Sequence, residues 1–136
     1  RSSAASDVYK RQALAGITGL SSPSVGERLR RLEERGVLTH YTVDIDPKHF
    51  GYLLQAIVRI RPLPGKLQEV ERQIQAIPEF TECDKVTGDD CFIARLHVRT
   101  MDQLDSLLDR LNVYAETNTA IVKKTPVKRR LPPLAD

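Results

Sequence analysis

The sequence predicts an α+β protein in which a helical N-terminal part precedes a four-stranded antiparallel sheet. Two observations predict the first part: residues 22–35 repeat apolar side chains at helical spacing, and β-branched residues follow directly in 37–46. A third observation predicts the second part, because residues 53–124 read in the order strand, helix, strand, strand, helix, strand. That order is the ferredoxin-like βαββαβ arrangement, in which both helices cover one face of the sheet.

The helix expected over residues 22–35 has recognisable ends. Ser21 or Ser22 can accept a hydrogen bond from a free amide at its start, and Pro23 suits the first helical position. Gly36 stands where a helix commonly ends in a left-handed residue. We therefore expect a short helix with a defined stop at each end.

The two faces of this helix differ in chemistry. Val25, Leu29 and Leu32 recur at intervals of four and three residues, which predicts one face that packs on a core. Arginine pairs with phosphate or with the guanine edge and serine can bond either, so the opposite face suits DNA. A solvated surface helix of mixed charge is the alternative. The DNA-facing candidates on this helix are Ser22, Ser24, Glu27, Arg28, Arg31 and Arg35.

The segments on either side place this helix in a larger motif. Ala13, Leu14 and Ile17 suggest a preceding helix, which would end at Gly19. Residues 37–46 alternate β-branched or aromatic side chains with polar ones, which predicts a short strand or hairpin. Helix, tight turn, basic helix and strand follow one another as in a winged helix-turn-helix. The wing residues expected near phosphate are Thr39 and His40.

Five parts are expected along the chain. Residues 1–12 are serine-rich and lack a helical stripe, so we expect a non-native or disordered leader in place of a first helix. The winged helix-turn-helix of residues 13–46 would then be partial, and its DNA binding weaker than that of a relative with the whole motif. A linker is expected at 47–52, the ferredoxin-like domain at 53–124 and a basic tail at 125–136.

Each element of the ferredoxin-like domain has its own signal. Strands are expected over 53–61, 79–86, 91–98 and 113–124, and helices over 66–77 and 101–111. Pro78 ends the first of these helices, and the sequence TGDD makes a turn between the two central strands. One face of such a sheet is left uncovered, which favours association of two copies of the chain.

Charge is distributed unevenly along the chain, although the net charge is only +3. Lys and Arg against Asp and Glu number 8 against 6 in residues 1–52, 8 against 11 in 53–122 and 5 against 1 in 123–136. A basic front and an acidic body fit a DNA-binding part joined to a part that does not bind DNA. The basic tail could either touch phosphate or stay solvated.

Several classes of protein are disfavoured. No run approaches the roughly 20 apolar residues that span a bilayer and no charged-then-apolar leader opens the chain, so we expect a cytoplasmic protein without membrane contact. Cys83 and Cys91 form no zinc-spaced motif with the histidines, so we expect reduced packing thiols, no metal and no cofactor. An enzyme is an unfavoured alternative, because no catalytic motif appears and the paired acids Asp89 and Asp90 more simply cap a turn.

The TGDD turn and the later ETNT segment are the candidates for a small-molecule site. Backbone amides, a hydroxyl and two carboxylates in one tight loop could hold the ammonium and carboxylate ends of an amino acid. Glycine and aspartate are also ordinary turn residues, and threonine-rich strands need no ligand. The candidate effector-binding residues are Thr87, Gly88, Asp89, Asp90, Cys91, Thr117, Asn118 and Thr119.

A resemblance to the Lrp/AsnC family, the feast-or-famine regulators of bacteria and archaea, is carried by LSSPSVGERLRRLEERGVLTHYTVDIDPKHFGY, KVTGDDCFIARLHV and ETNTAIV. It implies a DNA-binding domain joined to an effector-sensing ferredoxin-like domain, with dimers that often assemble into octamers. It also implies a small-molecule site at the subunit boundary near the glycine-aspartate turn. That turn usually reads glycine, acid, any residue, aspartate in the family, and Cys91 here replaces the last carboxylate.

The residues and the resemblance together predict a sequence-specific DNA-binding transcriptional regulator that responds to an amino acid or a related small molecule. Its partners would be palindromic double-stranded DNA, the effector, and further copies of the same chain as a dimer or octamer. The alternative is a stand-alone, oligomeric amino-acid sensor whose DNA-binding half is defective.

Overall fold

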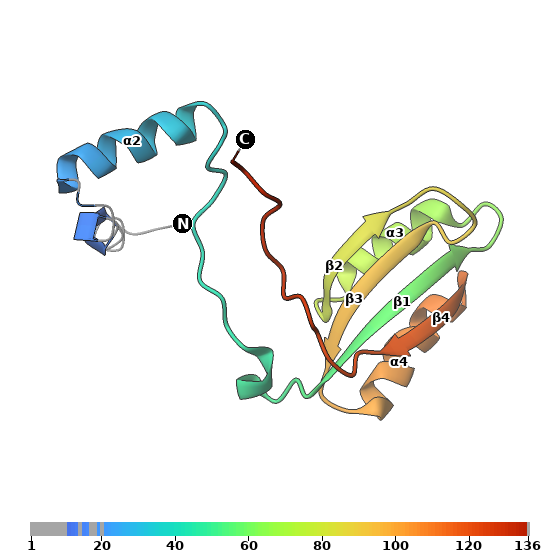
Figure 1. Ribbon diagram of the computed structural model, residues 1–136. Helices are drawn as coiled ribbons and strands as arrows, with labels where there is room; N and C mark the ends of the chain where they lie inside the picture. The colour runs from blue at the N-terminus through green and yellow to red at the C-terminus, as the bar shows by residue number, and fades with distance from the viewer. Residues whose placement is uncertain (1–10, 14, 17–18, 20, 136) are drawn as a thin grey trace. The chain divides into compact units, whose positions relative to one another are not determined.

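The computed structural model describes residues 11–13, 15–16, 19 and 21–135. The chain divides into two compact units, residues 1–45 and residues 46–136. The first unit contains helix α2 (Ser22–Glu34), and the second contains the sheet and its helices (Figure 1). Most of the predicted leader, together with Leu14 and Ile17, lies outside the described residues.

Helix α2 begins and ends through local hydrogen bonds. The Ser21 hydroxyl accepts a bond from the Ser24 amide at 3.3 Å, so Ser21 is the cap and Pro23 is the second helical residue instead of the first. At the other end Gly36 adopts a φ of 74°, as expected. The amides of Gly36 and Val37 donate to the Glu33 and Leu32 carbonyls at 3.0 and 2.8 Å, which is the Schellman arrangement that glycine permits.

The apolar stripe of α2 faces inward, as its spacing predicted. Val25 is buried, and Leu29 and Leu32 are half-buried. Arg11 and Gln12, which we assigned to the leader, are instead helical together with Ala13. Arginine and glutamine are good helix formers, so the absence of an apolar stripe did not exclude a helix there.

The strand predicted over residues 37–46 does not form. This segment is extended but belongs to no sheet, and Val43 and Ile45 are 74% and 61% exposed. A strand is stable only when its amides and carbonyls pair with a second strand, and the part of the chain that the structure describes offers none here. The segment is tied back to α2 by the Tyr41 hydroxyl, which donates to Glu33 Oε1 at 2.5 Å.

A short 3₁₀ helix, η1 (Pro47–Phe50), occupies the expected linker. Its start is capped by Asp46, whose Oδ1 accepts a hydrogen bond from the Lys48 amide at 3.0 Å. Gly51 ends it with a φ of 86°, a conformation that side-chain-bearing residues rarely adopt. The linker is therefore a structured element that leads directly into the sheet.

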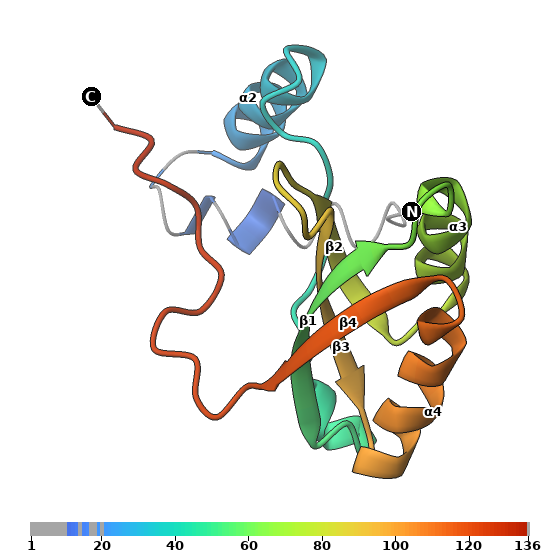
Figure 2. The same cartoon turned by 90° about the vertical axis from the view of Figure 1, so that its right-hand side faces the viewer.

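The second unit has the ferredoxin-like fold that the sequence predicted. Its antiparallel sheet has the order β2-β3-β1-β4. The strands are β1 (Leu54–Pro62), β2 (Phe80–Lys85), β3 (Phe92–Val98) and β4 (Ala115–Ile121), and the helices are α3 (Leu67–Ala76) and α4 (Met101–Asn112). Both helices lie on the same face of the sheet (Figure 2).

The core lies between this face and the two helices. Alternate side chains of β1 and β3 point into it, and Leu104 and Leu111 of α4 pack against them. The fully buried large side chains of the chain's described part are Val58, Ile60, Val70, Ile77, Leu96, Val98, Leu104 and Leu111. The edge strand β2 contributes little, because all of its residues after Phe80 are exposed and a register shift separates Phe80 from Glu82.

The other face of the sheet is not covered by either helix, and we call it the open face. Because β1 buries positions 56, 58 and 60, its intervening side chains lie on the open face together with their partners on the neighbouring strands. These residues are Gln55, Ile57, Arg59, Arg61, Ile93, Arg95, His97, Glu116, Asn118 and Ala120. Among the described residues, no helix is long and apolar enough to cross a bilayer.

Candidate functional site

A strip of exposed polar side chains runs along α2. Ser24, Arg28, Arg31 and Arg35 follow one another at intervals of four, three and four residues, which places them on one side of the helix. All four are exposed. The strip runs beside the apolar stripe that contains Val25, and its exposed side chains can meet a partner while the apolar stripe packs inward. We call these four residues the arginine strip.

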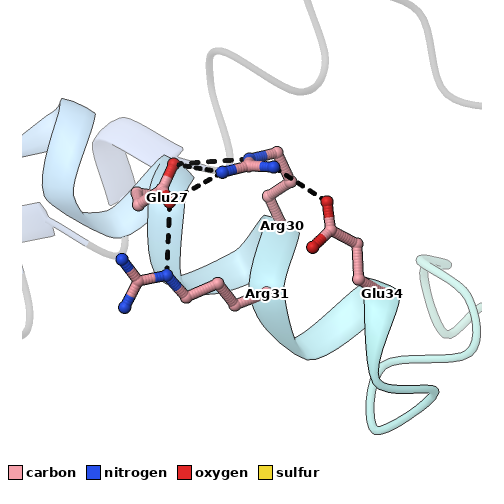
Figure 3. Close-up of polar contacts among 4 residues, drawn as sticks. All are labelled: Glu27, Arg30, Arg31 and Glu34. Atoms are coloured by element: carbon pink, nitrogen blue, oxygen red, sulfur yellow. Dashed lines mark hydrogen bonds and ion pairs between the residues drawn. The ribbon is translucent and has the colours of Figure 1, made fainter.

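Ion pairs beside the strip distinguish the arginines of α2 from one another (Figure 3). Arg30 binds Glu27 through two nitrogens and also pairs with Glu34 at 2.8 Å. The Arg31 Nε donates to Glu27 at 3.2 Å. Hydrogen bonding and charge from Arg30 lower the pKa of Glu27, and the same contacts raise the pKa of Arg30. Exposed pairs of this kind add little stability, so their main effect is to orient the side chains.

The remaining arginines are available for a partner. Within the described chain the side chains of Arg28 and Arg35 have neither a hydrogen bond nor an ion pair. Arg31 is held only through Nε, which leaves its two terminal nitrogens facing outward. Arg30, which was not among the predicted DNA-facing residues, is instead paired with the carboxylates of Glu27 and Glu34.

The other predicted DNA-facing residues are less uniformly placed. Ser22 and Glu27 are half-buried and, with Arg11, line a hollow of about 380 Å³ on another side of α2. Thr39 and His40 are exposed and contact each other, with Thr39 Oγ1 3.2 Å from His40 Nδ1. They lie on the extended segment and not on a wing strand. The structure therefore brings together Ser24, Arg28, Arg31 and Arg35 and leaves these four outside the strip.

The TGDD turn closes the β2–β3 hairpin. The Val86 amide donates to the Cys91 carbonyl at 2.7 Å, and Gly88 has a φ of 103°. Thr87, Gly88 and Asp89 are exposed, whereas Asp90 is half-buried. The turn thus presents backbone groups and one carboxylate to solvent and holds a second carboxylate closer to the sheet.

Asp90 has a partner that the sequence did not reveal. Its Oδ1 lies 3.5 Å from Arg61 Nε, and Arg61 is an open-face residue near the end of β1. Arg61 is also the register partner of Glu116 on β4. A carboxylate and a guanidinium therefore stand together where the turn meets the open face.

The ETNT segment forms part of β4 and does not join the turn within one chain. β3 and β1 separate β4 from β2 in the sheet. Thr117 and Thr119 pair with Ile60 and Val58 and point to the helix side, where the Thr117 hydroxyl donates to Asn112 Oδ1 at 2.9 Å. Asn118 lies on the open face opposite Arg59. Of the three, only Asn118 shares a face with Arg61.

Both cysteines are unpaired, but their surroundings differ. Cys91 packs against the core, and its thiol lies 3.8 Å from the Asp89 carbonyl. Cys83 is exposed on the edge strand, which corrects the expectation that it packs. Partial burial raises the pKa of its thiol, and the charges of Asp84 and Glu71 add to the shift. Among the described residues, no group of three or more His, Cys, Asp or Glu could hold a metal ion.

The known proteins that this chain resembles are transcriptional regulators. Residues 55–132 match the family described as "Lrp/AsnC ligand binding domain". The chain is 32% identical over 115 residues to the HTH-type transcriptional regulator FL11 of Pyrococcus horikoshii, an alignment that covers 82% of this chain and 76% of FL11. The family match covers most of the sheet domain, and the relative is a transcriptional regulator.

Solved structures show the same architecture. The structure of Bacillus subtilis LrpC superposes with a TM-score of 0.80 at 24% identity, covering 88% of this chain and 85% of LrpC. A feast or famine regulatory protein from Mycobacterium tuberculosis, complexed with L-methionine, superposes with a TM-score of 0.75 at 32% identity, covering 88% and 84% of the two chains. The relatives named here are regulators and not enzymes.

Proposed function

The chain belongs to the Lrp/AsnC family of transcriptional regulators, and from this membership we propose that it binds specific DNA sequences and responds to an amino acid or a related small molecule. The observation that carries the proposal is the arginine strip, in which Arg28 and Arg35 are exposed and have no partner within the described chain. Unpaired guanidinium groups on one helix face suit phosphates and guanine edges in a major groove.

A two-fold assembly would present two such strips. The open face of the sheet has apolar side chains, such as Ile57 and Ile93, that a second copy of the chain would cover. Two α2 helices related by a two-fold axis read a palindromic site, with half-sites about one helical turn apart. Assembly into a dimer, further growth to an octamer and a cytoplasmic location are parts of this proposal.

The effector site we propose lies where the turn meets the open face. An amino acid carries an ammonium and a carboxylate, and Asp90 and Arg61 offer the opposite charge to each of them. Their ion pair is about half exposed, so a ligand could separate the two groups at small cost. The methionine complex of the Mycobacterium tuberculosis relative supports an amino acid as the class of ligand. Thr87, Gly88, Asp89 and Asn118 would surround this pair, and Cys91 would lie beneath the turn.

A single substitution tests the DNA-binding proposal. Arg28→Ala should weaken binding to a preferred site by about 1–3 kcal/mol if Arg28 reads a base, and should reduce the preference over random duplex. Arg110→Ala on α4 removes one exposed arginine of the sheet domain and serves as the matched control. Fluorescence anisotropy with the DNA upstream of the protein's own gene, at one fixed salt concentration, gives both affinities. Equal affinities for the two variants and the parent would contradict the role of Arg28.

The effector proposal needs a separate measurement. L-methionine titrated into the full chain by calorimetry should give binding that Asp90→Asn and Arg61→Gln each weaken. Asp102→Asn on α4 removes one exposed carboxylate elsewhere and should leave the affinity unchanged. Binding that neither substitution alters would place the ligand elsewhere on the molecule.

A sensor without DNA binding is a second candidate function. It is favoured by one observation, the absence of a wing strand in the described residues 37–46. On this interpretation the chain would bind an amino acid and assemble with copies of itself, but it would bind no duplex even at low salt. The two titrations above separate the alternatives, because only a regulator gives a positive result in both.

A further inference from the structure

The C-terminal tail is the most strongly charged segment that the proposed function leaves unused. β4 ends at Ile121. Just after it, the Val122 amide donates a hydrogen bond to the Gln55 carbonyl of β1 at 2.8 Å. The described residues beyond it form no helix or strand and are exposed. Five of them are cationic: Lys123, Lys124, Lys128, Arg129 and Arg130.

These cations have no neutralising neighbour among the residues that the structure describes. Within the described chain none of the five side chains makes a hydrogen bond or ion pair. No acid occurs between Glu116 and Asp136. The preceding residues 53–122 carry 8 Lys and Arg against 11 Asp and Glu, so the tail reverses the charge of the domain to which it is attached. Such an isolated block of like charge repels itself and stays extended.

The tail is also built to remain extended. Pro126, Pro132 and Pro133 cannot continue a helix and favour an open backbone. Fully extended, residues 123–136 can reach up to about 45 Å from the sheet. A segment with this reach and charge can follow a phosphate backbone without a fixed position relative to its own domain.

We propose that residues 123–130 are a second DNA contact, which binds the phosphate backbone of duplex DNA outside the bases that α2 reads. This inference rests on the proposed DNA-binding function and names a further part of the same interface. The tail adds affinity for any sequence and little preference among sequences, because lysine and arginine bound to phosphate read no base edge.

The shape of the salt dependence identifies such a contact. Each phosphate neutralised on B-DNA steepens the fall of log K with log salt by about 0.9. Removing three cations from the tail should therefore flatten the slope by about 2–3 for each bound protomer. At a salt concentration near 0.15 M the same loss should weaken binding roughly 10-fold or more, equally on specific and random duplex.

The test compares two triple variants of the full chain. The tail variant is Lys128→Gln, Arg129→Gln and Arg130→Gln. The matched control, Lys66→Gln, Arg72→Gln and Arg110→Gln, removes the same charge from exposed positions on and beside α3 and α4. Fluorescence anisotropy on a short random-sequence duplex, from about 50 to 200 mM salt, gives each slope. Light scattering checks that both variants assemble like the parent.

The expected result is a flatter slope for the tail variant and a parental slope for the control. Equal slopes for both variants, in a protein that Arg28→Ala still weakens, would overturn the tail contact and leave the proposed function standing. Flattening by both variants alike would also overturn it, since the effect would then belong to net charge. A parent chain that binds no duplex at the lowest salt would overturn the proposed function and this inference together.

Discussion

The guanidinium group of Arg99 lies over the ring of Tyr52, with its carbon 4.3 Å from the ring centre. The same group donates through Nη1 to the Phe50 carbonyl at 2.5 Å. The backbone of Arg99 is held as well, because its amide donates to Gln103 Oε1 of α4 at 2.6 Å. One side chain between β3 and α4 thus holds the linker that contains η1 against the sheet domain.

Removing this side chain should loosen the linker. Arg99→Ala loses a cation–π contact and a charge-assisted hydrogen bond, and we expect a fall of about 1–2 kcal/mol in the free energy of unfolding of the sheet domain. Residues 46–53 should also become a faster target for limited proteolysis. Arg110→Ala is the control, and urea unfolding followed by circular dichroism gives the stabilities. Unchanged proteolysis in Arg99→Ala would show that the contact does not restrain the linker.

Gly51 can be tested against a second glycine with similar backbone geometry. Gly51 and Gly65 have φ values of 86° and 78°, so alanine strains both positions by about 1 kcal/mol. A Cβ at Gly51 would also lie 2.5 Å from Arg99 Nη1, whereas nothing lies within 4 Å of one at Gly65. Gly51→Ala should therefore displace the guanidinium group and destabilise the chain more than Gly65→Ala. Equal losses of unfolding free energy in the two variants, measured by urea unfolding, would contradict the predicted clash.

The core should respond strongly to truncation in α4. Leu111 is fully buried, and Leu111→Ala should lower the free energy of unfolding by about 2–5 kcal/mol because it leaves a cavity. Leu131 is 65% exposed in the tail, so Leu131→Ala should have almost no effect. Chemical denaturation of the two variants side by side measures the difference. Similar losses at both positions would mean that the tail packs in a way the fold does not show.

The stability of the sheet should depend on pH through His97. Partial burial on the open face lowers the pKa of His97, and Arg95 adds to the shift, although Glu82 opposes it. The unfolded chain, with a histidine pKa near 6.5, therefore binds more protons than the folded chain in the window just below that value. Stability contributed by neutral His97 is present above about pH 6.5 and is lost as the pH falls through the lower folded value.

A histidine variant isolates this effect. His97→Gln should flatten the dependence of the unfolding midpoint on pH between about 7.5 and 5.5, while His49→Gln, at an exposed position of η1, should follow the parent. A parental pH dependence in His97→Gln would exclude this residue as the cause.

The sheet domain could be predicted from the sequence because its patterns are local. Alternation over residues 53–61 and 91–98 predicted β1 and β3 to within one residue of their observed bounds. Residues 37–46 show a similar alternation and form no strand. The difference lies in strand pairing. The backbone of β1 is hydrogen-bonded to β3 on one side and to β4 on the other, whereas an alternating pattern alone does not supply a partner strand.

The candidate sites were predicted less completely, because they depend on contacts between distant segments. The spacing of Arg28, Arg31 and Arg35 on α2 was sufficient to predict one exposed face. No spacing linked Arg61 to Asp90, which are 29 residues apart and meet only through the order of the strands. Conversely, the contiguous ETNT segment was taken as one unit, although strand geometry sends Thr117 and Asn118 to opposite faces.

The irregular edge of the sheet bears on how the protein resists aggregation. An exposed edge strand can recruit a strand from another chain, and this begins the growth of fibrils. The register shift between Phe80 and Glu82 interrupts the β2 edge, and the charged side chains of Glu82, Asp84 and Lys85 oppose uncontrolled pairing there. At the opposite edge, strand addition to β4 would bring in the cations of the tail. We therefore expect charge repulsion between copies to protect the β4 edge, as the bulge protects the β2 edge, and the sheets to resist joining edge to edge when the protein is concentrated.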